Sequence, residues 1–291
     1  MKESVQKRLT RGLGSRPVSW KAPQGGYTRA QRWITTLADG RSAFVKLALD
    51  PLTAGWLRDE MRMYHTHQLD ILPRLLWWDD DPQEPMLVIE DLSAMTWTEA
   101  WTPARVEAVQ ETLRTLNALA APKDTPSMTD KMGAMRGWPQ VAQDPEPFLS
   151  TAVASQSWLE RALPTLMDVD RVKVLQGDAL CHLDVRSDNL CFRPDGRAIL
   201  VDWNFACTGN ARIDLAAWAP SLHMQGGPPP ETLLPHAPAE AAFISGYFAS
   251  VAGLDPATAS VKIRALQRNQ LKVALPWACR ALELPPPDLL D

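Results

Sequence analysis

The chain of 291 residues is 45% hydrophobic, which is enough to build a buried core and excludes a wholly disordered protein. Thirty basic and thirty-four acidic side chains give a formal net charge of −4, a balance that does not favour a nucleic acid or an anionic membrane as the main partner. The sequence has no apolar run long enough for a transmembrane helix and no apolar segment behind residues 1–8, so we expect a cytosolic protein without a secretory signal.

The first predicted elements make the N-terminal part rich in sheet. Residues 29–48 form a predicted β-hairpin, because two β-prone runs flank Asp39 and Gly40, a dipeptide that suits a tight turn with positive φ angles. Residues 53–68 have a helical period of apolar residues, carried by Leu57, Met61 and Tyr64. Two further apolar runs, expected to be strands, span residues 71–78 and 86–90. The predicted order is β-β-α-β-β.

The character of the chain changes after residue 92, and helices are expected to dominate from there. Thr102 and Pro103 are typical of an N-cap and a first helical turn. One face of that helix is predicted to hold Val106, Val109, Leu113, Leu116 and Ala120. Further along, the sequence predicts a short strand region at 189–202, a proline-rich loop at 226–238, and helices at 239–252 and 256–282, the last kinked at Pro276. We therefore expect two units, residues 1–92 and 93–291.

The segment most informative about function contains His182, Asp184 and Asn189 in the pattern H-x-D-x-x-x-x-N. Asp202 follows thirteen residues later, at the end of a predicted buried strand. In phosphoryl transfer, a carboxylate such as Asp184 can accept the proton of an acceptor hydroxyl. The amide oxygen of Asn189 and the carboxylate of Asp202 are ligands that Mg²⁺ prefers. The pattern favours a magnesium-dependent kinase.

Two residues of the N-terminal part complete this interpretation. Lys46 lies on the second strand of the hairpin, where its ammonium group could neutralise nucleotide phosphates. Glu60 interrupts the apolar stripe of the following helix, and a buried carboxylate needs a partner, for which Lys46 is the natural candidate. Gly25 and Gly26 precede the first predicted strand and would let the backbone approach phosphates closely, although a full G-x-G-x-x-G is absent.

These motifs together resemble the aminoglycoside phosphotransferase and choline kinase-like family. The resemblance covers roughly residues 20 to 220 and rests on the H-x-D-x-x-x-x-N segment, on Lys46 and Glu60, and on four further groups: Val88 to Leu92, Val201 to Trp203, Gly209, and Asp214 to Ala216. It implies an α+β, two-lobed protein-kinase-like fold, with a small antiparallel-sheet N-lobe and a larger, mainly helical C-lobe. ATP or GTP would bind in the cleft under a hinge, and the acceptor hydroxyl would approach from the C-lobe.

The resemblance also implies a role for each matching residue. Asp184 would be the catalytic base, Asn189 and Asp202 the magnesium ligands, and Lys46 the cation on the α- and β-phosphates, oriented by Glu60. The hinge residues Ile89, Glu90, Asp91 and Leu92 would contact adenine. Asp214 would brace the catalytic loop from behind. From the residues themselves, we expect His182 to hold the loop, and Arg186 either to touch a phosphate or acidic acceptor group or to form a surface salt bridge.

Two residues depart from the usual pattern of that family. Leu183 stands between the histidine and the aspartate, where a glycine is usual, and Asn204 occupies a position that is often acidic. We interpret Leu183 as a packing change without chemical consequence. Asn204 changes the charge expected around the metal.

The acceptor is left open by the sequence. The leading hypothesis is an ATP-dependent phosphotransferase acting on a hydroxyl of an aminoglycoside-like antibiotic, with a role in resistance, or of a similar metabolite. The near balance of acids and bases in residues 215–291 gives no support for a polycationic acceptor in particular. Alternatives are a metabolic kinase for choline, homoserine or a thiosugar, a nucleotide-binding pseudokinase, and a metal phosphoesterase. No nucleic acid or membrane partner is expected, and the oligomeric state stays open.

Overall fold

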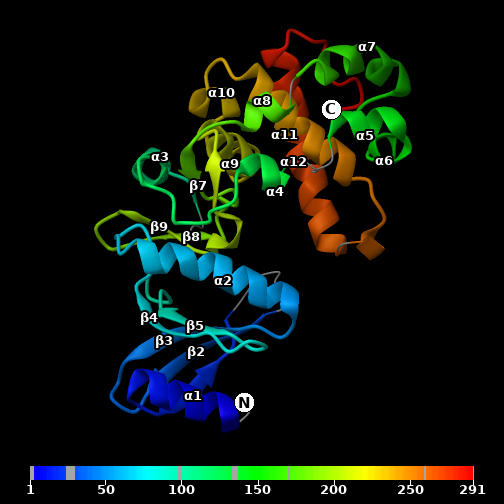
Figure 1. Ribbon diagram of the computed structural model, residues 1–291. Helices are drawn as coiled ribbons and strands as arrows, with labels where there is room; N and C mark the ends of the chain where they lie inside the picture. Colours follow the sequence, from blue (N-terminus) through cyan, green and yellow to red (C-terminus); the bar gives the residue numbers. More distant parts are fainter. Residues whose placement is uncertain are drawn as a thin grey trace.

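The computed structural model describes residues 3–23, 30–97, 100–132, 137–169, 171–258 and 260–290. The chain forms a smaller lobe built on a sheet and a larger, mainly helical lobe (Figure 1). The sheet of the small lobe has five antiparallel strands in the order β1-β2-β3-β5-β4. Their bounds are β1 Pro17–Lys21, β2 Gln31–Leu37, β3 Ser42–Leu47, β4 Leu75–Asp79 and β5 Met86–Glu90.

The two faces of this sheet contact different parts of the molecule. Successive side chains of β3 point alternately to one face and to the other. Ala43, Val45 and Leu47 pack in one apolar cluster with the buried side of helix α1 (Glu3–Leu13). Phe44 and Lys46 take the alternate positions, on the face turned toward helix α2 (Pro51–Thr66) and the helical lobe. Figure 1 shows α1 and α2 on opposite sides of the sheet. Lys46 is thereby aimed at the region between the lobes.

Helix α2 begins at a well-formed cap. Asp50 accepts a hydrogen bond from the Thr53 backbone N–H at 2.7 Å, and the Thr53 hydroxyl accepts from the Asp50 N–H at 3.2 Å. This reciprocal capping box, with Pro51 in the first turn, fixes where the helix starts. The residue at which the helix starts determines the direction around the helix axis in which each later side chain points. The cap therefore also places Glu60 on the buried side, with Leu57 and Tyr64.

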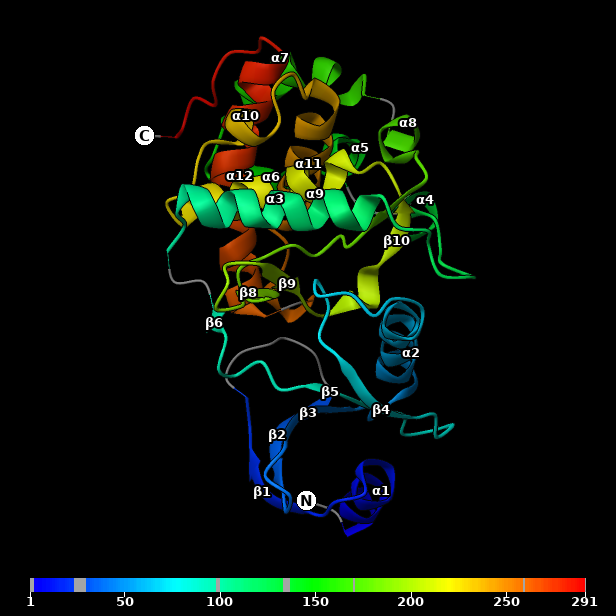
Figure 2. The same ribbon diagram turned by 90° about the vertical axis from the view of Figure 1, so that its left-hand side faces the viewer.

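The large lobe holds most of the helices. Its longest are α3 Pro103–Asn117, α7 Gln156–Met167, α9 Arg212–Met224, α11 Pro238–Val251 and α12 Val261–Ala281. Shorter ones are α4 Met128–Met132, α5 Trp138–Gln143, α6 Glu146–Leu149, α8 Arg171–Leu175 and α10 Pro230–Leu233, with 3-10 turns η1 Trp203–Phe205 and η2 Pro256–Thr258. Helices α9, α11 and α12 pack on one another, behind α3 in the view of Figure 2.

Two small sheets lie on the side of the large lobe that faces the small lobe (Figure 2). One joins β6 Thr96–Trp97, β8 Leu190–Phe192 and β9 Ala198–Leu200, and the other joins β7 Ala179–Cys181 and β10 Cys207–Gly209. The loop after β7 and the residues after β9 carry the H-x-D-x-x-x-x-N segment and Asp202. The Leu200 N–H also donates to the Ile71 carbonyl at 2.9 Å, so this hairpin is tied to the small lobe.

The fold class expected from the sequence is confirmed, with several corrections to the elements. Helix α1 and strand β1 precede the predicted β-β-α-β-β series, so the observed order is α-β-β-β-α-β-β, and Gly25 and Gly26 follow the first strand instead of preceding it. β1 escaped prediction because it is an edge strand with no buried residue. Gly25 and Gly26 themselves lie outside the described residues.

Other helix boundaries in the structure differ from the predicted ones by a few residues. Helix α3 ends at Asn117, so Ala120 lies beyond it and is exposed, contrary to the predicted helix face. The segment expected to be a loop contains the short helix α10, and the last helix begins at Val261 and runs through Pro276. Within the described part of the chain, no helix has both the length and the apolar character needed to cross a bilayer.

Candidate active site

A cluster of three charged side chains joins the lobes; Lys46 and Glu60 are buried in it, and Asp202 is partly buried. The Lys46 ammonium lies 2.8 Å from Glu60 Oε2 and 3.0 Å from Glu60 Oε1, and it also pairs with Asp202 Oδ1 from the end of β9. The Tyr64 hydroxyl donates to Glu60 Oε1 at 2.9 Å. The Glu60 carboxylate therefore receives hydrogen bonds from both side chains, which offsets the cost of burying it. The expected Lys46–Glu60 pair is present.

The charges within this cluster do not balance. Burial acts to lower the pKa of Lys46, but the carboxylates of Asp202 and Glu60 outweigh it and raise that pKa above its ordinary value, so the ammonium stays charged. Burial likewise acts to raise the pKa of Asp202, yet the adjacent Lys46 brings it below its ordinary value. Burial raises the pKa of Glu60. One ammonium facing two carboxylates leaves a site that favours a further cation.

The loop after β7 is held in place from α9 and from the strand beside it. The Asp214 carboxylate accepts the backbone N–H groups of His182 at 2.9 Å and Leu183 at 2.7 Å. The His182 ring packs edge-on against Trp203 with ring centroids 4.5 Å apart. Both His182 and Asp214 are fully buried, behind the loop and away from solvent. These contacts place His182 and Asp214 behind the loop, and the loop-holding role of His182 stays a prediction.

The hydrogen bonds of His182 also define its protonation state. Its Nδ1 accepts the Asp184 backbone N–H at 3.2 Å, and its Nε2 lies 2.9 Å from the Val201 carbonyl, to which it can only donate. The ring is therefore the neutral form with its proton on Nε2. Burial, the largest influence, lowers the pKa of His182 to about 4, in agreement with this neutral state.

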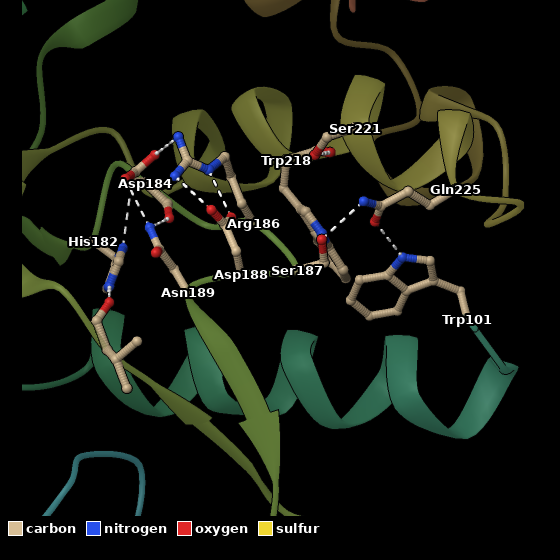
Figure 3. A network of polar contacts seen from close by, with 11 residues as sticks. Trp101, His182, Asp184, Arg186, Ser187, Asp188, Asn189, Trp218, Ser221 and Gln225 are labelled. Atoms are coloured by element: carbon tan, nitrogen blue, oxygen red, sulfur yellow. Dashed lines mark hydrogen bonds and ion pairs between the residues drawn. The ribbon is translucent and has the colours of Figure 1, made fainter. Parts of the chain in front are cut away.

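Asp184 and Asn189 lie side by side in this loop (Figure 3). The Asn189 amide nitrogen donates to the Asp184 carbonyl at 2.9 Å and to Asp184 Oδ2 at 2.7 Å. Both amide hydrogens are thus used on Asp184, which leaves Asn189 Oδ1 as the atom available to act as a ligand. Burial raises the pKa of Asp184, while the charge of Arg186 acts to lower it. A raised pKa makes this carboxylate a stronger base.

Arg186 bridges two carboxylates at the front of the loop. Its Nη1 lies 3.2 Å from Asp184 Oδ1, and its Nε lies 3.0 Å from Asp188 Oδ1 (Figure 3). Of the two interpretations left open by the sequence, the salt bridge is the contact seen, and it is made to the candidate base itself. Arg186 also faces the space between the lobes, where it lies within reach of a ligand.

Two backbone positions in the site have positive φ angles. Leu183 has φ +64° and Asp202 has φ +63°, in the left-handed region that side chains other than glycine rarely adopt. The first explains why glycine would suit the position of Leu183, so the exchange carries a conformational cost that the sequence did not reveal. The carboxylate of Asp214 on the Leu183 N–H helps to hold this conformation.

A cleft of about 1000 Å³ lies between the lobes and collects most of the predicted residues. It is lined by Lys46, Asp184, Arg186, Asn189 and Asp202, and by the hinge residues Ile89, Glu90, Asp91 and Leu92. Glu60, His182 and Asp214 do not line it, because they support the lining residues from behind. Asn204 lines it as well, and its carbonyl accepts from Lys131 Nζ at 2.7 Å.

Several residues of the site were missed by the sequence analysis. Arg32 on β2 lines the cleft directly opposite Lys46 in the sheet register. Gln225 at the end of α9 donates to the Ser187 hydroxyl at 2.8 Å and accepts from the Trp101 indole at 2.9 Å, which ties the loop to the segment before α3 (Figure 3). An apolar surface from α11 and α12 forms another wall. Only the strand alternation around Arg32 could have indicated its position in advance.

Among the described residues, no group of three histidine, cysteine, aspartate or glutamate side chains is arranged to hold a metal ion. A magnesium ion is typically held by one or two protein oxygens together with substrate phosphates and water. Asp202 and Asn189 Oδ1, beside an excess of negative charge, match that donor set. The residues present therefore fit a metal that arrives with a nucleotide.

Comparison with solved structures identifies the fold. A choline kinase from Streptococcus pneumoniae is 14% identical, with a TM-score of 0.60 over 97% of this chain and 98% of that one. A macrolide 2'-phosphotransferase from Brachybacterium faecium is 15% identical, with a TM-score of 0.54 over 93% and 98%. An aminoglycoside phosphotransferase from Alicyclobacillus acidocaldarius is 13% identical, with a TM-score of 0.52 over 92% and 93%. The protein has the two-lobed, protein-kinase-like fold.

The family follows from a second comparison. The model of the phosphotransferase enzyme family matches residues 19–243, which is most of the chain and contains the charged residues of the candidate site, whereas α12 lies beyond it. The chain belongs to the phosphotransferase enzyme family. Comparison with curated protein sequences gives no significant match.

Proposed function

We propose that the protein transfers the γ-phosphoryl group of ATP, or of GTP, to a hydroxyl of a small molecule. The observation that carries this proposal is that the Lys46–Glu60–Asp202 cluster and the Asp184–Asn189 pair lie at one cleft, beneath the hinge. The first arrangement suits nucleotide phosphates and a metal, and the second suits an attacking hydroxyl. The two units that form the cleft are proposed to be residues 1–92 and 93–291.

On the nucleotide side, the base would lie against the hinge, residues 89–92. Lys46 would hold the α- and β-phosphates, and Glu60 would orient the ammonium group, since it is the partner that stays buried when a phosphate competes for Lys46. Gly25 and Gly26 are proposed to approach the phosphates, because a glycine pair lets the backbone come close to them. Arg32, beside Lys46, adds positive charge to the same wall.

Asp202 and Asn189 Oδ1 are proposed to hold magnesium. A magnesium ion held there would supply positive charge that neutralises the charge developing on the phosphate oxygens. Lys46 and magnesium would share Asp202, which is ionised because its pKa is held low by Lys46. Asn204, which is uncharged, adds no further carboxylate at this place.

On the acceptor side, Asp184 is proposed to accept the hydroxyl proton. The acceptor oxygen would attack the γ-phosphorus in line, a bond from that oxygen to phosphorus would form, and the bond to the nucleoside diphosphate would break. The proton would pass to the Asp184 carboxylate, whose raised pKa favours acceptance. Asn189 would orient that carboxylate, while His182 and Asp214 would hold the loop.

The location is proposed to be cytosolic. All four cysteines, Cys181, Cys191, Cys207 and Cys279, are free and buried, as expected of thiols in a reducing compartment. Burial also raises the pKa of each thiol, so they stay protonated and serve as small apolar side chains.

The experiment is the release of ADP or GDP by the purified full chain with magnesium. Aminoglycosides, other hydroxylated antibiotics, choline, homoserine and thiosugars serve as acceptors, with Asp184→Asn as the blank. Release that depends on an acceptor and exceeds the blank supports the proposal. Nucleotide that does not bind at all, or release that is equal in the blank, would refute it.

A further inference from the structure

The part of the cleft beyond Asp184 has a distinct composition. Helices α11 and α12 each line it with one face. The lining residues of each helix lie three or four positions apart, which is the spacing of neighbours on one helix face. We call this surface the apolar wall, and it consists of Phe243, Ile244, Tyr247, Phe248, Ile263 and Leu266. Gln267 and Gln270 border it, and Leu183 and Ala217 continue it toward Asp184. The wall therefore begins next to the candidate base.

The wall offers apolar surface without offering negative charge. Tyr247, Ile263 and Leu266 are only partly buried, so part of their apolar surface faces the cleft. Tyr247 lines the same cleft as Asp184 and Arg186 of the catalytic loop. Gln267 hydrogen-bonds the Tyr247 side chain and accepts from Arg264 at 2.7 Å, which fixes this edge of the wall.

The carboxylates at this end of the cleft already have a cationic partner. Asp184 and Asp188 line it, and both pair with Arg186. On α11 the acid Glu240 pairs with Arg212 and does not line the cleft. Helix α12 contains no acid and five bases, namely Lys262, Arg264, Arg268, Lys272 and Arg280. None of these five bases lines the cleft, so the charge at this end comes from Asp184, Asp188 and Arg186. A polycation that extended beyond this group onto the wall would lose hydration against apolar side chains and would find no carboxylate there.

The size of the cleft points in the same direction. About 1000 Å³ is at the upper end of the range that encloses drug-sized ligands, so an acceptor with a sizeable body fits beside a nucleotide. A small cation such as choline would leave most of the wall uncovered. Burial of apolar surface stabilises a complex by about 25 cal/mol per Å². An acceptor that covers the wall would therefore bind more tightly than one that leaves it exposed to water.

We propose that the acceptor is an uncharged alcohol with an apolar body, which packs on the wall while its hydroxyl reaches Asp184. This inference rests on the proposed function and narrows its acceptor class. In phosphoryl transfer, the same bonds would form and break as described under the proposed function, and the proton would again pass to Asp184. The apolar body of the acceptor would take no part in the reaction. Polycationic aminoglycosides and quaternary ammonium alcohols are the classes that it disfavours.

The experiment measures binding of an uncharged fluorophore, 6-propionyl-2-(dimethylamino)naphthalene, to the full chain. Four competitors share hydroxyl groups and differ in body and charge: 4-nitrophenyl β-D-glucoside, glucose, kanamycin and choline. We expect the nitrophenyl glucoside to displace the fluorophore at a concentration at least tenfold lower than any of the other three. Absence of fluorophore binding, or stronger displacement by kanamycin or choline, would overturn the proposal.

Two variants on one helix locate the site of binding. Leu266→Glu puts a carboxylate into the wall and should weaken fluorophore binding at least tenfold while improving competition by kanamycin. Val261→Glu, at an exposed position of α12 that does not line the cleft, is the matched control and should change neither. Equal effects of the two variants would contradict the assignment.

A third variant separates this inference from the proposed function. Asp184→Asn should keep fluorophore affinity within about twofold, because the wall remains intact. If nucleotide turnover is absent from the parent chain while the wall binds as described, the proposed function fails and the binding surface stands. If turnover is present and only charged acceptors react, the acceptor class is wrong and the function stands.

Discussion

The two ends of the cleft differ in charge and in the way their side chains are held. Around Lys46, Asp202 and Asp184, every charged group has a charged or hydrogen-bonding partner, and Lys46, Glu60 and Asn189 among them are buried. The apolar wall on α11 and α12 holds neutral side chains, three of which keep part of their surface exposed. The contrast indicates that the charged end is preorganised for one reaction, phosphoryl transfer. The apolar wall, in contrast, determines which acceptor binds.

The largest expected effect comes from the base. Asp184→Asn should lower kcat by about 10²- to 10⁴-fold, the usual contribution of a general base, with ATP affinity nearly unchanged. Asp188→Asn is the matched control, because Asp188 also pairs with Arg186 while the Asn189 side chain donates to Asp184, and it should stay within a few-fold. Steady-state kinetics with parallel ATP titration measures both. Similar losses in the two variants would remove the distinction between Asp184 and its neighbour.

The buried ion pair should give the next largest effect. Glu60→Gln leaves Lys46 paired with Asp202 alone and should lower kcat/KM for ATP by about 10- to 100-fold, which corresponds to about 1.4–2.8 kcal/mol. Tyr64→Phe removes one hydrogen bond to the same carboxylate and should cost about 1 kcal/mol or less. Kinetics with ATP as the varied substrate compares them. A larger effect of Tyr64→Phe would show that Glu60 does not act through Lys46.

The two buried groups behind the loop should oppose each other as pH changes. His182 has its pKa lowered to about 4 by burial, so its neutral form stabilises the fold above pH 6.5, and this stability is lost as the pH falls from 6.5 toward 4. Asp214 has its pKa raised to about 6 by burial, so its stabilising protonated form is present below 3.8 and is lost as the pH rises through 6.

The variant Asp214→Asn should therefore expose the effect of the histidine. Without the opposing titration, the free energy of unfolding should fall between pH 6.5 and 4 by on the order of 3 kcal/mol more than it does in the parent chain. Denaturant unfolding at a series of pH values gives this slope, which a constant loss of stability does not alter. Identical slopes for the two chains would contradict the assignment of Asp214.

Arg186 should affect the pKa of the proposed base, Asp184, without changing the apolar wall. Its charge acts to lower the pKa of Asp184, so Arg186→Gln should raise that pKa further and move the acid limb of the kcat profile to higher pH. Activity would then be lost at a pH where the parent is still active. Arg197→Gln, on the exposed hairpin between β8 and β9, is the control. An unshifted acid limb would mean that the arginine acts elsewhere.

The smallest effect is expected at Leu183. Its positive φ costs about 1–2 kcal/mol for a side chain other than glycine, while Leu183→Gly also removes a partly buried side chain. The two terms nearly cancel, so unfolding free energy should change by about 1 kcal/mol or less. Val185→Gly, at a buried neighbour without a positive φ, should cost about 2–4 kcal/mol. Equal losses would show that Leu183 is not strained.

The sequence predicted the charged end of the cleft far better than the apolar end. The H-x-D-x-x-x-x-N spacing and Lys46 are set by the geometry of phosphoryl transfer, so their pattern is recognisable without a structure. Glu60 was found because a carboxylate on an apolar helix face demands a partner. The apolar wall gives no such signal, since Phe243 and Leu266 are indistinguishable in sequence from core residues, and only the packing of α11 on α12 turns them into the cleft.

The missed elements have similar physical reasons. Strand β1 lies at the edge of the sheet and buries no side chain, so no alternation marks it. Helix α10 is four residues long within a proline-rich segment, where turns and helices share the same residues. The contact of Gln225 with Ser187 joins residues 38 apart in the chain, and depends on the end of α9, which no local pattern defines.

The most direct measurement of the central claim is the fate of the γ-phosphoryl group. The full chain is incubated with magnesium and ATP labelled on the γ-phosphate, with and without 4-nitrophenyl β-D-glucoside and the acceptor panel, and the label is separated into organic ester and inorganic phosphate. Phosphoryl transfer to an acceptor hydroxyl predicts label in an organic ester that forms only when an acceptor is present. Label that appears only as inorganic phosphate, at a rate that no acceptor changes, would contradict it.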